Sequence, residues 1–176
     1  MMLSIALLHY PCMDKNGEEV TTAITNLDLH DLARVCLTYG IDKLYIVHPY
    51  QVQRDFAEKI MSHWRTGYGG HYNPLRKKAF EVVRLAESID EIKADDNPLI
   101  VVTSARGYNK TISWIELKKR INTENICLVF GTGWGLAESF LEKADAVVEP
   151  IDAGTGYNHL SVRSAVSIAI DRLLGR

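Results

Sequence analysis

Cysteine is scarce in this sequence, with three residues in 176. Cys12, Cys36 and Cys127 are scattered, odd in number and without CxxC spacing. A disulfide framework and a structural zinc site are therefore both disfavoured. We accordingly expect a protein of a reducing compartment, the cytosol.

Long hydrophobic runs and an excess of one charge are also lacking. No stretch approaches the length of a membrane span, and the short apolar run Leu3–Leu8, with no basic residue before it, is typical of a first strand rather than a signal peptide. Twenty basic and twenty-two acidic side chains give a net charge of −2, which argues against a generally basic nucleic-acid binder. The length and ordinary composition predict one domain over residues 1–176.

Familiar metal and nucleotide motifs are missing as well. The six histidines form no HExxH or other ligand spacing, so we expect no metal site. The turn at 131–135 reads Gly-Thr-Gly-Trp-Gly, but the third glycine of a dinucleotide fingerprint would fall on Leu136. Such a fingerprint also belongs to the first strand of its sheet, and here only about forty residues follow. A tight strand-to-helix turn without a ligand stays an alternative for this segment.

One local segment departs from the mildly acidic average. Residues 63–78 carry four fixed positive charges, three aromatic side chains and no acid. Aromatic faces can stack on unpaired bases while Arg and Lys contact phosphates. The alternative is a solvated loop between two helices with locally packed aromatics.

Apolar runs alternate with helical periodicity along the whole chain. The predicted strands are Leu3–His9, Lys43–His48, Leu99–Thr103, Ile126–Phe130 and Ala146–Glu149. The predicted helices cover 28–39, about 52–64, 74–86 with the cap Asn73-Pro74, 113–121 with a capping box, and 161–175. This alternation predicts an α/β fold with a mainly parallel sheet flanked by helices.

The last predicted helix is apolar around much of its circumference. Such a helix lies either inside the fold or against a second copy of the chain, and we favour the second interpretation. Before it come two loops, at 131–135 and 157–161, each placed at the end of a buried strand. A helix N-terminus and free amides there could hold a polar small molecule.

Three segments together resemble one family of enzymes. Residues 27–41 followed by the strand 44–47 are similar to the first motif of the SPOUT class of RNA methyltransferases. The turn Leu128–Glu138 is similar to the second motif and Ile151–Ala165 to the third, while Thr103-Ser-Ala-Arg106 resembles a strand end of the ribose-methylating branch. The resemblance spans nearly the whole chain, with its motifs in the right order.

The resemblance implies a deep C-terminal trefoil knot and S-adenosylmethionine as the cofactor. It further implies an RNA substrate, tRNA first, and a homodimer through the final helix in which Arg34 of one subunit approaches the cofactor of the other. The implied cofactor-binding residues are Thr103, Ser104, Phe130, Gly131, Thr132, Gly133, Gly135, Ile151, Tyr157, Asn158, His159 and Leu160.

The implied catalytic residues are Arg34, His159, Asp28, Asn158 and Ser161. We expect Arg34 to hold a phosphate or ribose oxygen, His159 to accept the proton with Asp28 second, and the other two to orient acceptor or cofactor. Asp28 and His159 stand where the ribose-methylating branch has Asn, so a ribose hydroxyl and a base nitrogen both stay open as acceptors. A non-catalytic RNA- or nucleotide-binding module on the same scaffold is the alternative function.

Overall fold

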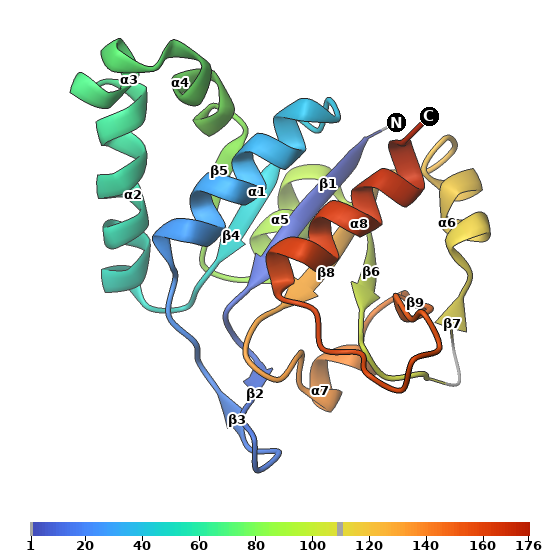
Figure 1. The fold of residues 1–176 in the computed structure, drawn as a ribbon. Helices are drawn as coiled ribbons and strands as arrows, with labels where there is room; N and C mark the ends of the chain where they lie inside the picture. Colours follow the sequence, from blue (N-terminus) through green and yellow to red (C-terminus); the bar gives the residue numbers. More distant parts are fainter. Residues whose placement is uncertain (1, 109–110) are drawn as a thin grey trace.

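The computed structural model describes residues 2–108 and 111–176, and its centre is a seven-stranded parallel sheet (Figure 1). The strand order is β5-β4-β1-β8-β6-β9-β7, and every pairing within it is parallel. The strands are β1 (Leu3–Leu8), β4 (Leu44–Val47), β5 (Val83–Ala86), β6 (Leu99–Thr103), β7 (Thr111–Ile112), β8 (Ile126–Gly131) and β9 (Ala146–Val148). The predicted α/β class is confirmed.

Both faces of the sheet are covered, as the near-continuous apolar strands require. In β1, Ile5 and Leu7 belong to one buried cluster, whereas Ala6 and Leu8 belong to the other, because successive side chains point to opposite faces. The first cluster packs under α1 (Asn26–Thr38), α2 (Gln51–Arg65), α4 (Pro74–Phe80), α6 (Trp114–Arg120) and α8 (Val162–Leu174). The second packs under α5 (Ile89–Asp96) and α7 (Glu138–Leu141).

The predicted helix ends are confirmed where capping chemistry marked them. Asn73 accepts a hydrogen bond from the backbone of Arg76 at 3.0 Å at the start of α4, and Ser113 accepts one from Glu116 at 3.1 Å at the start of α6. Gly40 follows α1 with φ +72°, the left-handed conformation that ends many helices.

The helix predicted through Ala86 is wrong in its second half. α4 ends at Phe80, and Val83–Ala86 forms the edge strand β5, which pairs with β4. The interpretation of 63–78 as a loop is also wrong, because this segment holds the end of α2, the short helix α3 (Tyr68–Tyr72) and part of α4. The hairpin β2–β3 (Cys12–Met13 and Glu19–Val20), α5, α7 and β7 were not predicted.

The final helix begins after Ser161 as predicted and lies beside α1 (Figure 1). Only half of its apolar side chains are buried within this chain. Val166, Ala169, Ile170 and Leu173 are buried, while Val162, Ala165, Ile168 and Leu174 keep part of their surface exposed. The C-terminal knot stays a prediction of the family resemblance.

Candidate functional site

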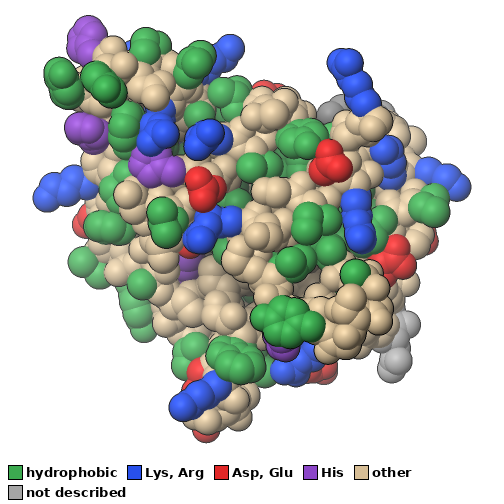
Figure 2. Space-filling view, viewed as in Figure 1, with side chains coloured by type: hydrophobic (Ala, Val, Ile, Leu, Met, Phe, Trp, Pro, Cys, Tyr) green, Lys and Arg blue, Asp and Glu red, His purple; other side chains and the backbone are tan. Residues whose placement is uncertain are grey.

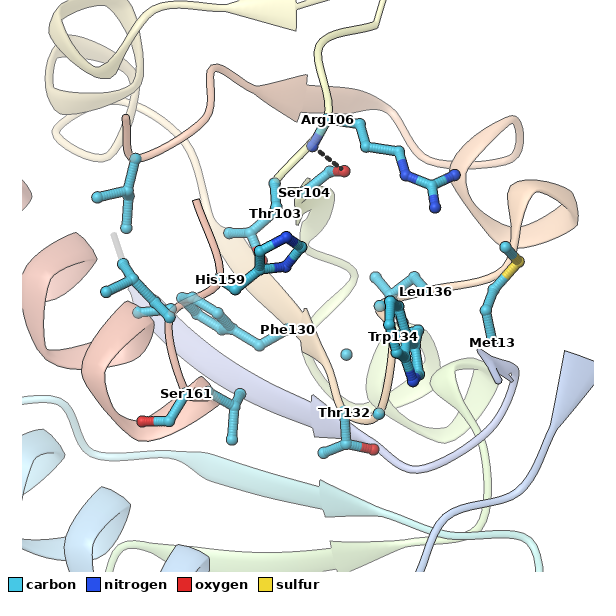
Figure 3. Close-up of a pocket in the computed structure, with 18 of the residues that line it drawn as sticks. Met13, Thr103, Ser104, Arg106, Phe130, Thr132, Trp134, Leu136, His159 and Ser161 are labelled. Atoms are coloured by element: carbon cyan, nitrogen blue, oxygen red, sulfur yellow. Dashed lines mark hydrogen bonds between the residues drawn. The ribbon is translucent and has the colours of Figure 1, made fainter. Parts of the chain in front are cut away.

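A cavity of about 1110 Å³ opens at the carboxyl ends of β8, β6 and β9 (Figure 3). These three strands are neighbours in the sheet, so the loops that follow them meet at one edge. In open parallel sheets this edge is where ligands bind. The walls come from the loops after the three strands, from the first turn of α8 and from the segment between β1 and α1.

The glycine turn after β8 forms one wall of the cavity. At Gly131 an added Cβ would lie 2.8 Å from both the backbone nitrogen and Cγ of Leu136, so only glycine lets the turn fold back this tightly. Gly133 and Gly135 have φ values of +60° and +101°, which side chains rarely adopt. Between them Trp134 is 60% exposed at the cavity rim (Figure 3).

Two side-chain hydrogen bonds hold the other loops together. The Thr103 hydroxyl donates to the Val129 carbonyl at 3.0 Å, which fixes the end of β6 against β8. The Asn158 amide donates to the Ala105 carbonyl at 3.1 Å and so joins the loop after β9 to the loop after β6. These hydrogen bonds therefore hold the walls of the cavity in fixed positions relative to one another.

A buried histidine supports the glycine turn through two threonines. The hydroxyls of Thr22 and Thr132 are hydrogen-bonded to each other, and Nδ1 of His9 lies 3.0 Å from the Thr22 hydroxyl. Burial lowers the pKa of His9 to about 4; His48, whose ring centroid is 5.7 Å away, acts in the same direction, and Asp28 opposes it. The His9 ring is therefore neutral in the folded protein at neutral pH.

Asp28 is the buried carboxylate of the cavity wall. Its Oδ1 accepts a hydrogen bond from Nη1 of Arg163 at 2.9 Å, and its Oδ2 accepts one from the Thr25 hydroxyl at 2.6 Å. Nε of Arg163 also lies 3.3 Å from Oδ2 of Asp31. The cation paired with both aspartates is thus Arg163 of α8, and Arg34 is exposed in the adjacent groove between α1 and α8.

The structure brings most of the predicted site residues into one cavity. Those that line it are Asp28, Thr103, Ser104, Phe130, Gly131, Thr132, Gly133, Gly135, Ile151, Asn158, His159, Leu160 and Ser161. Arg34 and Tyr157 do not line it, and Tyr157 is 73% exposed with its ring 5.3 Å from that of His159. The Ser161 hydroxyl accepts a hydrogen bond from the backbone of Ser164 at 3.3 Å, so this side chain also caps α8.

Several residues that line the cavity were not predicted from the sequence. Thr22 and Thr25 belong to a segment without helical or strand periodicity, so no local pattern marked them. Trp134 and Arg163 lie inside the motifs that carried the resemblance, but nothing about their own residue types indicated a role.

Over residues 2–108 and 111–176, no group of three or more His, Cys, Asp or Glu side chains could hold a metal ion. In the same part of the chain, no helix is both long and apolar enough to cross a membrane.

Comparison with known proteins gives the family. A family model described as "SAM-dependent RNA methyltransferase" matches residues 2–175. An uncharacterized protein of Aquifex aeolicus is 41% identical over 180 residues, covering 98% of this chain and 88% of that protein. A tRNA (guanine-N(1)-)-methyltransferase of Oleidesulfovibrio alaskensis is 37% identical over 179 residues, but this chain spans only 42% of its length.

Solved structures share the fold. TrmJ from Z. mobilis gives a TM-score of 0.64 at 17% identity, covering 98% of this chain and 69% of that one. A structure titled "Structural insights into the 2-OH methylation of C/U34 on tRNA" gives 0.59 at 20% identity, covering 99% and 98%. The SpoU methyltransferase AviRb from Streptomyces viridochromogenes, solved with AdoMet, gives 0.59 at 14% identity, covering 98% and 57%. This chain belongs to the family of S-adenosylmethionine-dependent RNA methyltransferases.

Proposed function

We propose that this chain transfers the methyl group of S-adenosylmethionine to RNA, with tRNA as the first substrate to test and a ribose 2′-hydroxyl as the favoured acceptor. The observation that carries the proposal is the cavity at the ends of β8, β6 and β9, where thirteen residues expected from the family motifs converge. The buried, unpaired cysteines agree with a cytoplasmic setting.

The cavity fits the cofactor in chemistry and in size. Trp134, Ile151 and Leu160 offer apolar surface for an adenine ring, and the hydroxyls of Thr103 and Ser104 offer polar partners for a ribose or an amino-acid group. Small-molecule sites occupy roughly 300–1,000 Å³, so a cavity of about 1110 Å³ also leaves room for part of an acceptor nucleotide. When bound, S-adenosylmethionine supplies an electrophilic methyl group on a sulfonium centre.

The protein's own contribution would be alignment of the acceptor and removal of its proton. Alignment alone can supply roughly 7–11 kcal/mol of a barrier. His159, exposed at the cavity mouth, is the proposed proton acceptor. Asp28 is less suited to that task because both its oxygens already accept hydrogen bonds, from Arg163 and Thr25. Its proposed part is to hold Arg163 at the cavity wall.

A second copy of the chain would complete the site. Arg34 lies outside the cavity of its own chain, in the groove between α1 and α8 with Ser161 and Ile168. This groove borders α8, several of whose apolar side chains are partly exposed. A homodimer through α8 would bury this surface and allow Arg34 to reach the partner's cavity, where a guanidinium suits a phosphate or ribose oxygen.

The preference for ribose over base rests on the 103–106 strand end and on the fold shared with a protein whose title concerns 2-OH methylation of tRNA. The guanine-N(1) name belongs to relatives of which this chain covers 42%, so that activity need not reside in the matching part.

The direct test combines binding and product analysis. Calorimetry should show one S-adenosylmethionine bound per subunit, and mass spectrometry of nucleosides should show a new methylated nucleoside after incubation of bulk tRNA with the protein and cofactor. A 2′-O-methyl nucleoside supports the proposal in full, whereas a methylated base would correct the acceptor. Absence of cofactor binding would favour the non-catalytic module instead.

A further inference from the structure

One segment of this chain carries basic side chains and no acidic ones. Residues 59–80 contain five basic and no acidic side chains, which leaves fifteen basic and twenty-two acidic residues for the rest of the chain. The segment forms the end of α2, all of α3 and all of α4. In Figure 1 these helices lie at the far side of the molecule from the loops that line the cavity.

Residues 59–80 form a closely packed group of helices, which we call the helical platform. Gly69 and Gly70 of α3 are buried, and a Cβ on Gly69 would lie 2.6 Å from the ring of His63. A Cβ on Gly70 would lie 2.3 Å from the carbonyl oxygen of Trp64. Only glycine therefore allows α3 to pack this closely against the end of α2.

Further internal contacts join α2 to α4 and β5. The Arg65 guanidinium donates to the Phe80 carbonyl at 2.8 and 3.0 Å and to the Val83 carbonyl at 2.6 Å, which ties α2 to the end of α4 and to β5. The Arg76 guanidinium lies 4.9 Å from the ring centroid of Trp64. These contacts hold the outer residues of α3 and α4 in place.

The outer surface of this platform is aromatic and basic. Tyr68 and Tyr72 are 75% and 78% exposed, and their rings stack with centroids 6.3 Å apart and 23° between planes. Lys77 and Lys78 are exposed on the neighbouring helix. Among the residues that the structure describes, no ion pair joins a cation of 59–80 to a carboxylate. Figure 2 shows hydrophobic, histidine and basic side chains gathered over α3 and α4.

We propose that Tyr68, Tyr72, Lys77 and Lys78 form a second RNA-binding surface that takes unpaired nucleotides of the substrate. The inference rests on the proposed function, because it assigns this surface to the RNA that the cavity would methylate. Aromatic faces stack on any base, and adjacent lysines neutralise the phosphates of the same strand. The rest of the chain carries fifteen basic and twenty-two acidic residues, so a local basic site strengthens the hold on a polyanion.

The test uses the full chain and three double variants. Tyr68→Ala/Tyr72→Ala removes the stacking faces, Lys77→Ala/Lys78→Ala removes the charges, and Tyr68→Phe/Tyr72→Phe keeps the rings. Lys118→Ala/Lys119→Ala is the matched control, since these exposed lysines are adjacent in α6 and change the net charge equally. Fluorescence anisotropy with bulk tRNA and with an unstructured oligoribonucleotide gives RNA affinity, calorimetry gives cofactor affinity, and light scattering gives the oligomeric state.

Loss of stacking should weaken oligonucleotide binding roughly tenfold or more. Loss of the lysine pair should reduce the slope of log affinity against log salt by about 1.4, roughly 0.7 for each phosphate contact. The Phe variant should bind like the unchanged protein, and all variants should keep their cofactor affinity. Because the surface lies away from the cavity, the alanine variants should raise KM for RNA and leave kcat nearly unchanged.

If the tyrosine and lysine alanine variants both keep full RNA affinity and methylation activity, the proposed RNA-binding surface is wrong, and the proposed function is unaffected. An equal loss of RNA affinity in the α6 control also contradicts the proposed surface, because the loss then reflects the net charge of the protein and not this site. A change of oligomeric state in the tyrosine variant assigns the surface to a protein contact instead. If the unchanged protein binds neither RNA nor cofactor, the proposed function fails together with this inference.

Discussion

Arg163 in α8 and Asp28 in α1 form an ion pair at the cavity wall, with Nη1 and Oδ1 2.9 Å apart. The side chain of Asp28 is 7% exposed and that of Arg163 is 33% exposed, so water reaches the guanidinium but hardly the carboxylate. It joins the helix that follows the β2–β3 hairpin to the helix that ends the chain.

Arg163→Ala should therefore lower the free energy of unfolding by about 2 kcal/mol, because it leaves a buried carboxylate without its charged partner. Urea denaturation measures the change. The double variant Asp28→Asn/Arg163→Ala should recover part of the loss, since the uncompensated charge is then gone. If the losses of Arg163→Ala and Asp28→Asn alone simply add up to that of the double variant, the two residues are not coupled.

The sequence identified the buried parallel strands because each is a short apolar run between helical patterns. It missed β5 because Val83–Ala86 follows α4 with no Gly or Pro to mark the change. It placed the cavity loops because their glycines and motifs are local. The ion pair between Asp28 and Arg163 joins residues 135 positions apart, and no local pattern reports such a contact. Asp28 and Asp31 lie one turn apart on α1, and the cation that pairs with both, Arg163, comes from another helix.

Gly131→Ala should weaken S-adenosylmethionine binding about fivefold or more. The added methyl group would lie 2.8 Å from Leu136, so the turn that forms the cavity wall must open. Overpacking of this kind costs about 1–3 kcal/mol. Calorimetric titration measures the affinity, and Gly107→Ala is the control, because nothing lies within 4 Å of a Cβ there. Equal affinities for the two variants would separate the turn from cofactor binding.

His9 should make the folded state less stable in mild acid. Because burial lowers the pKa of His9 from its ordinary value of 6.5 to about 4 in the folded state, the unfolded chain binds a proton between these pH values and the folded chain does not. This contribution is complete above pH 6.5 and is lost as the pH falls toward 4, by about 3 kcal/mol at about 1.4 kcal/mol per unit. His48 and His30, whose pKa values are also lowered by burial, act in the same direction.

Urea denaturation between pH 4 and 7 measures this dependence, and His9→Asn should make it shallower. NMR titration of the His9 ring gives the same information directly. A ring that titrates near pH 6.5 in the folded protein would contradict the effect of burial.

Ile168→Asp should convert the proposed homodimer into a monomer. Ile168 is a partly exposed residue of α8 in the groove beside Arg34, and a carboxylate buried in an apolar contact is strongly unfavourable. Analytical ultracentrifugation measures the mass. Ile115→Asp in α6, at a side chain that is 70% exposed, is the control and should leave the mass unchanged. A dimeric Ile168→Asp protein would place the interface elsewhere.

Arg34→Ala should abolish methyl transfer and leave cofactor affinity nearly intact, because Arg34 does not line the cavity of its own chain. His159→Ala should also be inactive. If Arg34 acts across the dimer, a mixed dimer of the two variants restores one site, since the Arg34→Ala subunit keeps His159 and receives Arg34 from its partner. If Arg34 acts within its own chain, each site of the mixed dimer has one defect and the mixture stays inactive. Co-expression with two affinity tags isolates the mixed dimer, and transfer of labelled methyl groups to tRNA decides between the two arrangements.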